Sequence, residues 1–183
     1  RTFTLDTRGA MRFPRIMNNL LHSLAFALVT ATAAHAGAGA NVNPPYAAPD
    51  VESTDQDGKP VKLADVYKAN PFVVVYFYPK ADTPGCTKQG CSLRDAHADL
   101  TKLGVKVIGV SADTAADQKK FADKFTFPFT LLADKEGKVI DAFKVAKRPN
   151  GMASRQCFII KNGQIVWHDP KGATDTQAAE VKT

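Results

Sequence analysis

The stretch from Phe72 to Cys91, FVVVYFYPKADTPGCTKQGC, joins a continuous apolar run to two closely spaced cysteines. The run Phe72–Tyr78 consists of β-branched and aromatic residues, which is typical of a strand buried on both faces in a parallel or mixed sheet. Thr83 and Pro84 then mark a helix start, because threonine favours the N-cap and proline the first helical position. The stretch therefore predicts a central strand, followed by a helix with Cys86 in its first turn.

Strand and helix patterns alternate on both sides of this stretch. The turn DQDGK predicts a hairpin of 51–54 with 61–63, and Asn162-Gly163 predicts a second hairpin of 156–160 with 164–167. This alternation favours an α/β, thioredoxin-like fold in which helices flank a central mixed β-sheet. The other expected elements are helices at 63–68, 84–103 and 113–125, strands at 105–110 and 130–133, a weaker element at 139–143, and a last helix after a capping box at 174–177.

The first 36 residues have the order of a secretory signal peptide. A basic lead begins at Met11, and an apolar run from Leu20 ends in the small-x-small site Ala34-His35-Ala36. We expect a signal peptide over 1–36, with 1–10 as an upstream extension, a flexible lead-in over 37–49 and one domain over 50–183. The expected location is periplasmic or extracellular, without stable membrane association after cleavage. A retained membrane anchor is the alternative, although about 17 apolar residues is short for a span.

Composition and charge exclude some classes of function. The chain has 183 residues, of which 44% are hydrophobic and 23% charged, as in a globular protein with a real core. The net charge of +6 falls to +3 without the first 36 residues, because four Arg and one Asp lie there. No basic run with interleaved aromatic residues occurs, so we expect no nucleic-acid partner.

The number of cysteines favours a chemical role for the thiols over a set of stabilising disulfides. An exported domain of this size needs no disulfides to fold, and three cysteines leave at least one thiol unpaired. Cys157 lies in a strand pattern beside Phe158 and is expected to pack in the core. Cys86 lies in the first turn of its helix, where free N–H groups and the helix dipole favour a thiolate.

The spacing of Cys86 and Cys91 argues against a disulfide in the folded helix. Residues five apart on a helix lie about 8–9 Å apart between Cα atoms, beyond the limit of about 7 Å for a disulfide. Gly90 lowers the resistance of the helix to unwinding by about 1 kcal/mol relative to alanine. Cys86 can therefore react first, and Cys91 can reach it after local unwinding, which suits oxidation of a thiolate to a sulfenic acid and then a disulfide.

Two polar side chains fit the same reaction. The hydroxyl of Thr83, three residues before the sulfur, can donate or accept a hydrogen bond. The guanidinium of Arg155, at the start of the RQCFII strand, is the candidate to hold both a thiolate and a peroxide. Peroxide cleavage releases a charged oxygen, which such donors stabilise.

The motif PKADTPGC, Pro79-x-x-x-Thr83-x-x-Cys86, resembles the active-site pattern of peroxiredoxins. The continuation CTKQGC with SLRD, and the motifs GVSAD and FPFTLLAD, are similar to the peroxiredoxin Q (bacterioferritin comigratory protein) subfamily. The similarity extends from about Ala48 to Val181. It implies that Cys86 is the peroxidatic and Cys91 the resolving cysteine.

The resemblance also implies roles for other residues and partners. Pro79 and Thr83 belong to the conserved loop, and Arg155 corresponds to the arginine that contacts thiolate and peroxide. The implied substrate is hydrogen peroxide or an organic hydroperoxide, and the implied reductant is a thioredoxin-like dithiol protein. The subfamily uses no metal or organic cofactor and is often monomeric.

Three other interpretations remain open from the sequence. An exported thiol–disulfide oxidoreductase of thioredoxin type would carry a C-x-x-C pair, which this sequence lacks. A non-enzymatic secreted domain would hold Cys86–Cys91 as a permanent structural disulfide. A zinc site with His97 or His168 is only weakly indicated, because C-x4-C is not a zinc-knuckle spacing.

Overall fold

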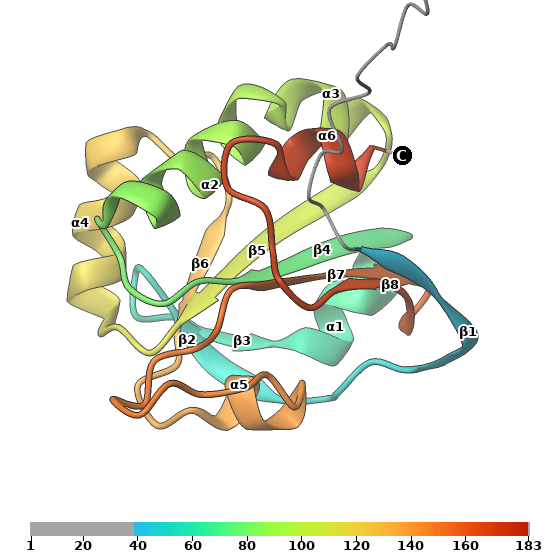
Figure 1. Ribbon diagram of the computed structural model, residues 1–183, viewed down its shortest axis with the longest axis horizontal. Helices are drawn as coiled ribbons and strands as arrows, with labels where there is room; N and C mark the ends of the chain where they lie inside the picture. Colours follow the sequence, from blue (N-terminus) through green and yellow to red (C-terminus); the bar gives the residue numbers. More distant parts are fainter. Residues whose placement is uncertain (1–38, 183) are drawn as a thin grey trace, which may run out of the picture. The chain divides into compact units, whose positions relative to one another are not determined.

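An eight-stranded mixed sheet organises the part of the chain that the structure, a computed structural model, describes, residues 39–182 (Figure 1). The strand order is β1-β8-β7-β4-β5-β6-β2-β3. The strands are β1 Ala40–Ala47, β2 Glu52–Asp55, β3 Pro60–Lys62, β4 Phe72–Phe77, β5 Val105–Ser111, β6 Thr130–Ala133, β7 Gln156–Lys161 and β8 Gln164–Asp169. The helices are α1 Leu63–Ala69, α2 Pro84–Asp95, α3 His97–Lys102, α4 Ala115–Phe125, α5 Lys138–Ala142 and α6 Gln177–Val181. The expected signal peptide lies outside the described residues.

The central strand β4 confirms the prediction from its apolar run. It pairs in parallel with β5 and antiparallel with β7, so the sheet is mixed as expected. Residues Val73 to Phe77 are all fully buried, because helices cover both faces of the sheet at this strand. The β2–β3 and β7–β8 hairpins also form where the Asp-Gly and Asn-Gly turns predict them.

Two groups of helices cover the two faces of the sheet (Figure 1). Helices α1 and α5 pack on one face, in a core that includes Leu63, Ile140 and Phe158. Helices α2, α3, α4 and α6 pack on the other face, in a core that includes Leu93 and Phe121. The sheet therefore separates two hydrophobic cores, and the helix that carries Cys86 and Cys91 belongs to the second.

The expected flexible lead-in over 37–49 is wrong for residues 40–47. They form the edge strand β1, which pairs antiparallel with β8 and has an irregularity between Asn41 and Tyr46. Most β1 side chains are exposed, because an edge strand is held mainly by its backbone hydrogen bonds. A pattern of buried side chains is therefore absent from the sequence of this strand.

Three other boundaries differ from the sequence prediction. The single helix expected over 84–103 is two helices, α2 and α3, because the backbone of Ala96 leaves helical geometry at φ −93° and ψ 0°. The last helix begins at Gln177 after Thr176, so the capping box expected at 174–177 does not form. The weaker element at 139–143 is the short helix α5.

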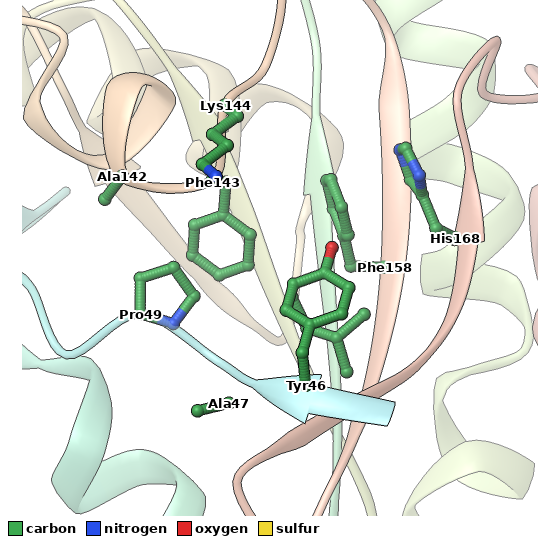
Figure 2. Close-up of a pocket in the computed structure, with 9 residues that line it drawn as sticks. Tyr46, Ala47, Pro49, Ala142, Phe143, Lys144, Phe158 and His168 are labelled. Atoms are coloured by element: carbon green, nitrogen blue, oxygen red, sulfur yellow. The ribbon is translucent and has the colours of Figure 1, made fainter. Parts of the chain in front are cut away.

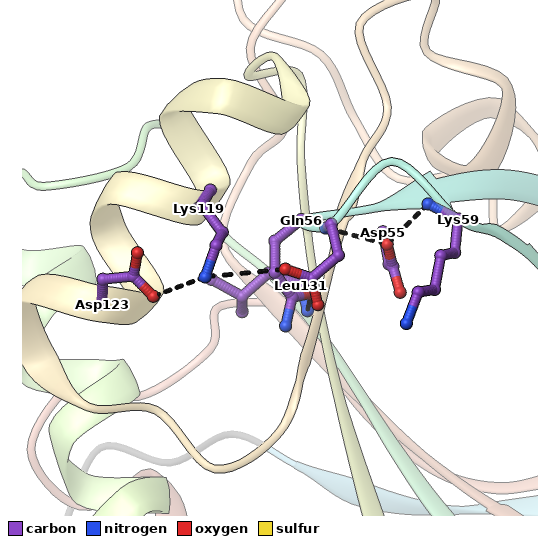
Figure 3. A network of polar contacts seen from close by, with 7 residues as sticks. Asp55, Gln56, Lys59, Lys119, Asp123 and Leu131 are labelled. Carbon is purple, nitrogen blue, oxygen red and sulfur yellow. Dashed lines mark hydrogen bonds and ion pairs between the residues drawn. The ribbon is translucent and has the colours of Figure 1, made fainter.

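Polar contacts connect the first hairpin to α4 and β6 (Figure 3). Lys119 of α4 pairs with Asp123 on the same helix and with Asp57 in the hairpin turn. The backbone N–H of Leu131 donates to the side-chain oxygen of Gln56 at 2.8 Å. These contacts hold the β2–β3 hairpin, at one edge of the sheet, against α4 and β6.

None of the helices in the described residues is long and apolar enough to cross a membrane.

Candidate active site

Cys86 lies in the first turn of α2, as the sequence predicts. Thr83 precedes the helix with extended backbone, and Pro84 is the first helical residue. The first N–H groups of a helix have no acceptor within it, so those near Cys86 are available to an anion or a thiolate. The Cys86 side chain is only 2% exposed. The Nη2 atom of Arg155 lies 3.4 Å from its sulfur.

Arg155 is held in a narrow slot between α2 and the segment after β8. Its Nη1 atom donates to the side-chain oxygen of Gln89, three residues after Cys86 on the same face of α2. A Cβ atom at Gly85 would lie 3.1 Å from Arg155 Nη2, and one at Gly172 would lie 2.5 Å from Arg155 Cγ. Gly172 also has a φ of +56°, which side-chain-bearing residues rarely adopt. Both glycines are therefore part of the Arg155 binding slot.

The loop between β4 and α2 is anchored to the end of β5. Pro79 is buried at the start of this loop. The backbone N–H of Ala81 donates to a carboxylate oxygen of Asp113 at 2.7 Å, and Ser111 Oγ donates to the same oxygen at 2.6 Å. These bonds hold the loop in the conformation from which α2 starts.

The Tyr78 hydroxyl supports this anchor from within the core. It donates to the side-chain oxygen of Gln118, whose nitrogen donates to Ser111 Oγ and to the carbonyl of Leu132. Burial raises the pKa of Tyr78, so its hydroxyl stays a neutral hydrogen-bond donor. The loop before Cys86 is therefore connected to α4 and β6 by a buried polar network.

Thr83 occupies the N-cap position, but its side chain makes no capping hydrogen bond. Its hydroxyl instead donates to the carbonyl of Lys80 at 3.0 Å. A hydroxyl that donates in one direction keeps its lone pairs for a second partner. Thr83 can therefore accept a hydrogen bond from a molecule bound beside Cys86.

Cys91 lies on the same helix as Cys86, and the two sulfurs are separate thiols. Cys86, Cys91 and Cys157 are all unbonded in the structure. Cys91 is partly buried against the core beneath α2. Its neighbour Gly90 is buried, and a Cβ atom there would lie 2.5 Å from the ring of Phe127. Gly90 therefore also permits close packing of α2 on an aromatic ring, a role that the sequence did not indicate.

Cys157 is the second residue of β7, opposite Tyr76 of β4, and is fully buried. Burial raises the pKa of its thiol well above the ordinary value, and the negative charges of Asp169 and Glu180 add to this effect. A thiol in these surroundings remains protonated and unreactive.

The pocket in Figure 2 lies on the other face of the sheet from Cys86. It is lined by β1, the end of α5 and side chains of β7 and β8, among them Tyr46, Phe143 and Phe158. The ring of His168 stacks on Phe158 at 4.2 Å between centroids. No predicted site residue lines this pocket. Within residues 39–182, no group of His, Cys, Asp and Glu side chains could hold a metal ion.

Comparison with known proteins places this geometry in a family. Residues 45–168 match the model of the AhpC/TSA family. The chain belongs to the AhpC/TSA family. Among curated relatives, the chloroplastic peroxiredoxin Q of Arabidopsis thaliana is 42% identical over 150 residues, which cover 81% of this chain and 68% of the relative. Peroxiredoxin bcp1 of Schizosaccharomyces pombe is 41% identical over 115 residues, 63% of this chain and 58% of the relative.

Solved structures of AhpC/TSA proteins have the same fold. Peroxidoxin BcpB from Mycobacterium tuberculosis aligns with a TM-score of 0.68 at 31% identity, covering 74% of this chain and 91% of that protein. A cysteine variant of Xanthomonas campestris peroxiredoxin Q aligns with a TM-score of 0.66 at 30% identity, covering 72% and 87%. The predicted thioredoxin-like fold and the resemblance to peroxiredoxin Q are thus confirmed. The chain spans 55% of the length of its rice peroxiredoxin Q relatives, which are 46% identical over 121 residues.

Three groups that shape this site were not predicted from the sequence. Gln89 orients Arg155, and its helical spacing from Cys86 was the available signal. Asp113 anchors the loop before α2, at the first position of the predicted helix 113–125. Gly172 leaves room for Arg155, and nothing in the local sequence indicates that contact. The Gln89 and Asp113 contacts could therefore have been sought among polar residues that follow a strand or that share a helix face with Cys86.

Proposed function

We propose that this chain is a thiol-dependent peroxidase that reduces hydrogen peroxide and organic hydroperoxides. The observation that carries the proposal is the contact between Arg155 Nη2 and the sulfur of Cys86 at 3.4 Å, in the first turn of α2. A guanidinium and free helical N–H groups at one sulfur favour a thiolate and can also bind an anionic leaving oxygen. The AhpC/TSA family match supports the same chemistry.

In the first step, the thiolate of Cys86 attacks one oxygen of the hydroperoxide. The O–O bond breaks, the sulfur is oxidised to a sulfenic acid, and the second oxygen leaves as hydroxide or alkoxide, which takes up a proton to give water or an alcohol. Arg155 and the N–H groups at the helix start stabilise the charge on that oxygen. Thr83 accepts a hydrogen bond from the peroxide, since its own proton is directed to Lys80.

In the second step, Cys91 resolves the sulfenic acid. Its thiol attacks the oxidised sulfur of Cys86, the S–O bond breaks, and the oxygen leaves as water while a disulfide forms. Both cysteines are on α2, and helical geometry keeps them beyond bonding range, so the helix must unwind between them. This unwinding separates Gly90 from the ring of Phe127, against which it packs.

In the third step, an external dithiol reduces the Cys86–Cys91 disulfide by thiol–disulfide exchange and is itself oxidised. We take this reductant to be a thioredoxin-like dithiol protein, as the match to the AhpC/TSA family supports. All residues assigned to the cycle belong to one chain, so a monomer is sufficient for it. Pro79 shapes the loop and does not contact substrate.

Two cysteine variants of the full chain test this function. Peroxide consumption with a small dithiol as reductant should be lost in Cys86→Ser, because the attacking atom is removed. Cys91→Ser should consume about one equivalent of peroxide and then recycle poorly, which is measured by following peroxide and free thiols together. Full steady-state turnover in Cys91→Ser would refute the resolving role of Cys91, and turnover in Cys86→Ser would refute the function itself.

We further propose that the segment 11–36 directs export and that the enzyme acts in the periplasm or outside the cell. The support is the basic lead, apolar run and small-x-small site of that segment. Mass spectrometry of the exported protein should then find an N-terminus after Ala36. An unprocessed chain in the cytoplasmic fraction would contradict this proposal.

A further inference from the structure

A row of hydrogen-bonded side chains connects Cys86 to the C-terminal helix α6. Arg155 contacts the sulfur of Cys86 through Nη2 and donates to the oxygen of Gln89 through Nη1. The nitrogen of Gln89 donates in turn to the oxygen of Gln177, the first residue of α6, at 2.8 Å. Gln89 and Gln177 are both completely buried.

The direction of these hydrogen bonds is fixed by Arg155. A guanidinium can only donate, so the amide of Gln89 must turn its oxygen toward Arg155 and its nitrogen toward Gln177. Gln177 must then present its oxygen to Gln89. An apolar residue at position 177 would leave the nitrogen of Gln89 buried without an acceptor, which is unfavourable.

The nitrogen of Gln177 is buried and has no hydrogen-bond partner among the described residues. An unsatisfied buried donor lowers stability, so packing alone does not account for glutamine at this position. The acceptor oxygen toward Gln89 is the favourable contact that this side chain makes. The amide at 177 is therefore best explained by what it does for Gln89.

A second contact between α2 and α6 is independent of this row. The backbone N–H of Ala178 donates to Ser92 Oγ at 3.1 Å. Ser92 holds α6 against α2 without contacting Gln89 or Arg155 in any of the hydrogen bonds of the described residues. The structure thus offers one contact that docks α6 and another that docks α6 and also reaches Cys86.

We propose that Gln177 is a positioning residue for the oxidation of Cys86, an inference that rests on the proposed peroxidase function. By accepting from Gln89, it keeps the Gln89 oxygen aimed at Arg155 and so keeps Arg155 against the sulfur. Unwinding of α2 for the second step moves Gln89 and breaks the row. Gln177 therefore promotes oxidation of Cys86 and has no part in the reduction of the disulfide.

The test compares Gln177→Met with Ser92→Ala in the full chain. Methionine keeps the length of glutamine but has no strong acceptor, so kcat/KM for peroxide should fall by about three- to tenfold while kcat at saturating peroxide changes little. Ser92→Ala should leave kcat/KM near that of the wild type. An equal loss in both variants would overturn the proposal, because Gln177 would then act only by docking α6.

A double-mutant cycle separates action through Gln89 from any other effect. In a Gln89→Met background, Gln177→Met should cause no further loss of kcat/KM, and an undiminished second loss would overturn the proposal. Gln177→Leu, which also lacks an acceptor but packs differently, should give the same loss as methionine. Gln177→Glu, which restores an acceptor oxygen, should be faster than both. Loss of activity through unfolding is recognised by circular dichroism of each variant.

The rate of Cys86 alkylation by iodoacetamide separates this inference from the proposed function. Gln177→Met should slow alkylation through the loss of Arg155 from the sulfur, whether or not the protein turns over peroxide. A wild-type chain that consumes no peroxide would overturn the function. An alkylation rate that Gln177→Met leaves unchanged would overturn the positioning role.

Discussion

Cys86 and Cys157 are two thiols in the same hydrophobic core with opposite surroundings. Their side chains are 2% and 0% exposed, so burial does not distinguish them. Cys86 lies at a helix start with the guanidinium of Arg155 at 3.4 Å. Cys157 lies near the start of β7, and burial with two nearby negative charges raises its pKa. The two thiols therefore differ in their partners rather than in their depth, and the partners of a thiol govern its reactivity.

The two thiols also differ in what holds them in place. Cys86 belongs to a helix that is anchored by polar side-chain contacts with α6 and by Gly90 on Phe127. Cys157 is held by backbone hydrogen bonds to strands on both sides, because β7 pairs with β4 and β8. A helix of this kind can unwind locally, while a central strand moves only when the whole sheet opens. The same difference is consistent with the resolving role proposed for Cys91 on α2, which requires the helix to unwind.

The largest expected effect comes from removing the guanidinium that distinguishes the two thiols. Arg155→Met should lower the rate of peroxide-dependent oxidation of Cys86 by about 10²–10³-fold, as for the loss of a donor to a charged transition state. Single-turnover kinetics with hydrogen peroxide measure this rate. Arg148→Met is the matched control, because Arg148 is exposed on the surface. If Arg155→Met lowered the oxidation rate of Cys86 by less than threefold, Arg155 would not be what distinguishes Cys86 from Cys157.

A smaller effect is expected from crowding Arg155 without changing it. Gly172→Ala places a Cβ atom 2.5 Å from Arg155 Cγ and should displace the guanidinium, which lowers kcat/KM for peroxide by about 10- to 100-fold. Gly163→Ala is the control, since Gly163 also has a positive φ, +75°, but nothing lies within 4 Å of its Cβ position. Both variants should lose about 1–2 kcal/mol of stability from backbone strain. Equal kinetics in the two variants would show that Arg155 tolerates displacement.

Most of the sheet could be predicted from the sequence because its signals are local. The apolar run of β4 and the Asn162-Gly163 turn each specify an element within a few residues. The edge strand β1 could not be predicted, because its side chains are mostly exposed and its partner β8 is more than 100 residues away in the chain. The break at Ala96 also escaped prediction, since alanine favours helix and the apolar spacing continues through it.

The candidate site could be predicted in part. Cys86 and Thr83 follow from helix-start signals. Arg155 was chosen as the guanidinium at the start of the RQCFII strand, and the resemblance then matched it to a family arginine. Gln89 and Gln177 contact each other across 88 positions of sequence, and Arg155 reaches Cys86 across 69. No propensity or periodicity reports such pairs, because they arise only when α2, α6 and β7 pack together. The position of Cys86 at a helix start was therefore easier to predict than the contacts that hold Arg155 beside it.

The smallest expected effect is that of replacing Cys157, the unreactive thiol in the comparison with Cys86. Cys157→Ala should leave kcat/KM for peroxide unchanged, because the thiol contacts no group assigned to the reaction. It should lower the free energy of unfolding at pH 7 by about 1 kcal/mol, since a buried atom is removed from a packed core. Urea unfolding followed by the fluorescence of Trp167, the single tryptophan of the chain, measures this change.

The pH dependence of that loss tests whether Cys157 is held neutral. Its folded pKa is raised above the ordinary value of 9.0, so the unfolded chain releases the thiol proton first as the pH rises. The stability that the wild type gains from this neutral thiol is complete below pH 9.0 and declines above it. Alanine has no proton to lose, so the gap in unfolding free energy between wild type and Cys157→Ala should narrow at pH 10. A gap that widens with pH would mean that the folded core accepts the thiolate, and the contrast between the two sulfurs would then fail.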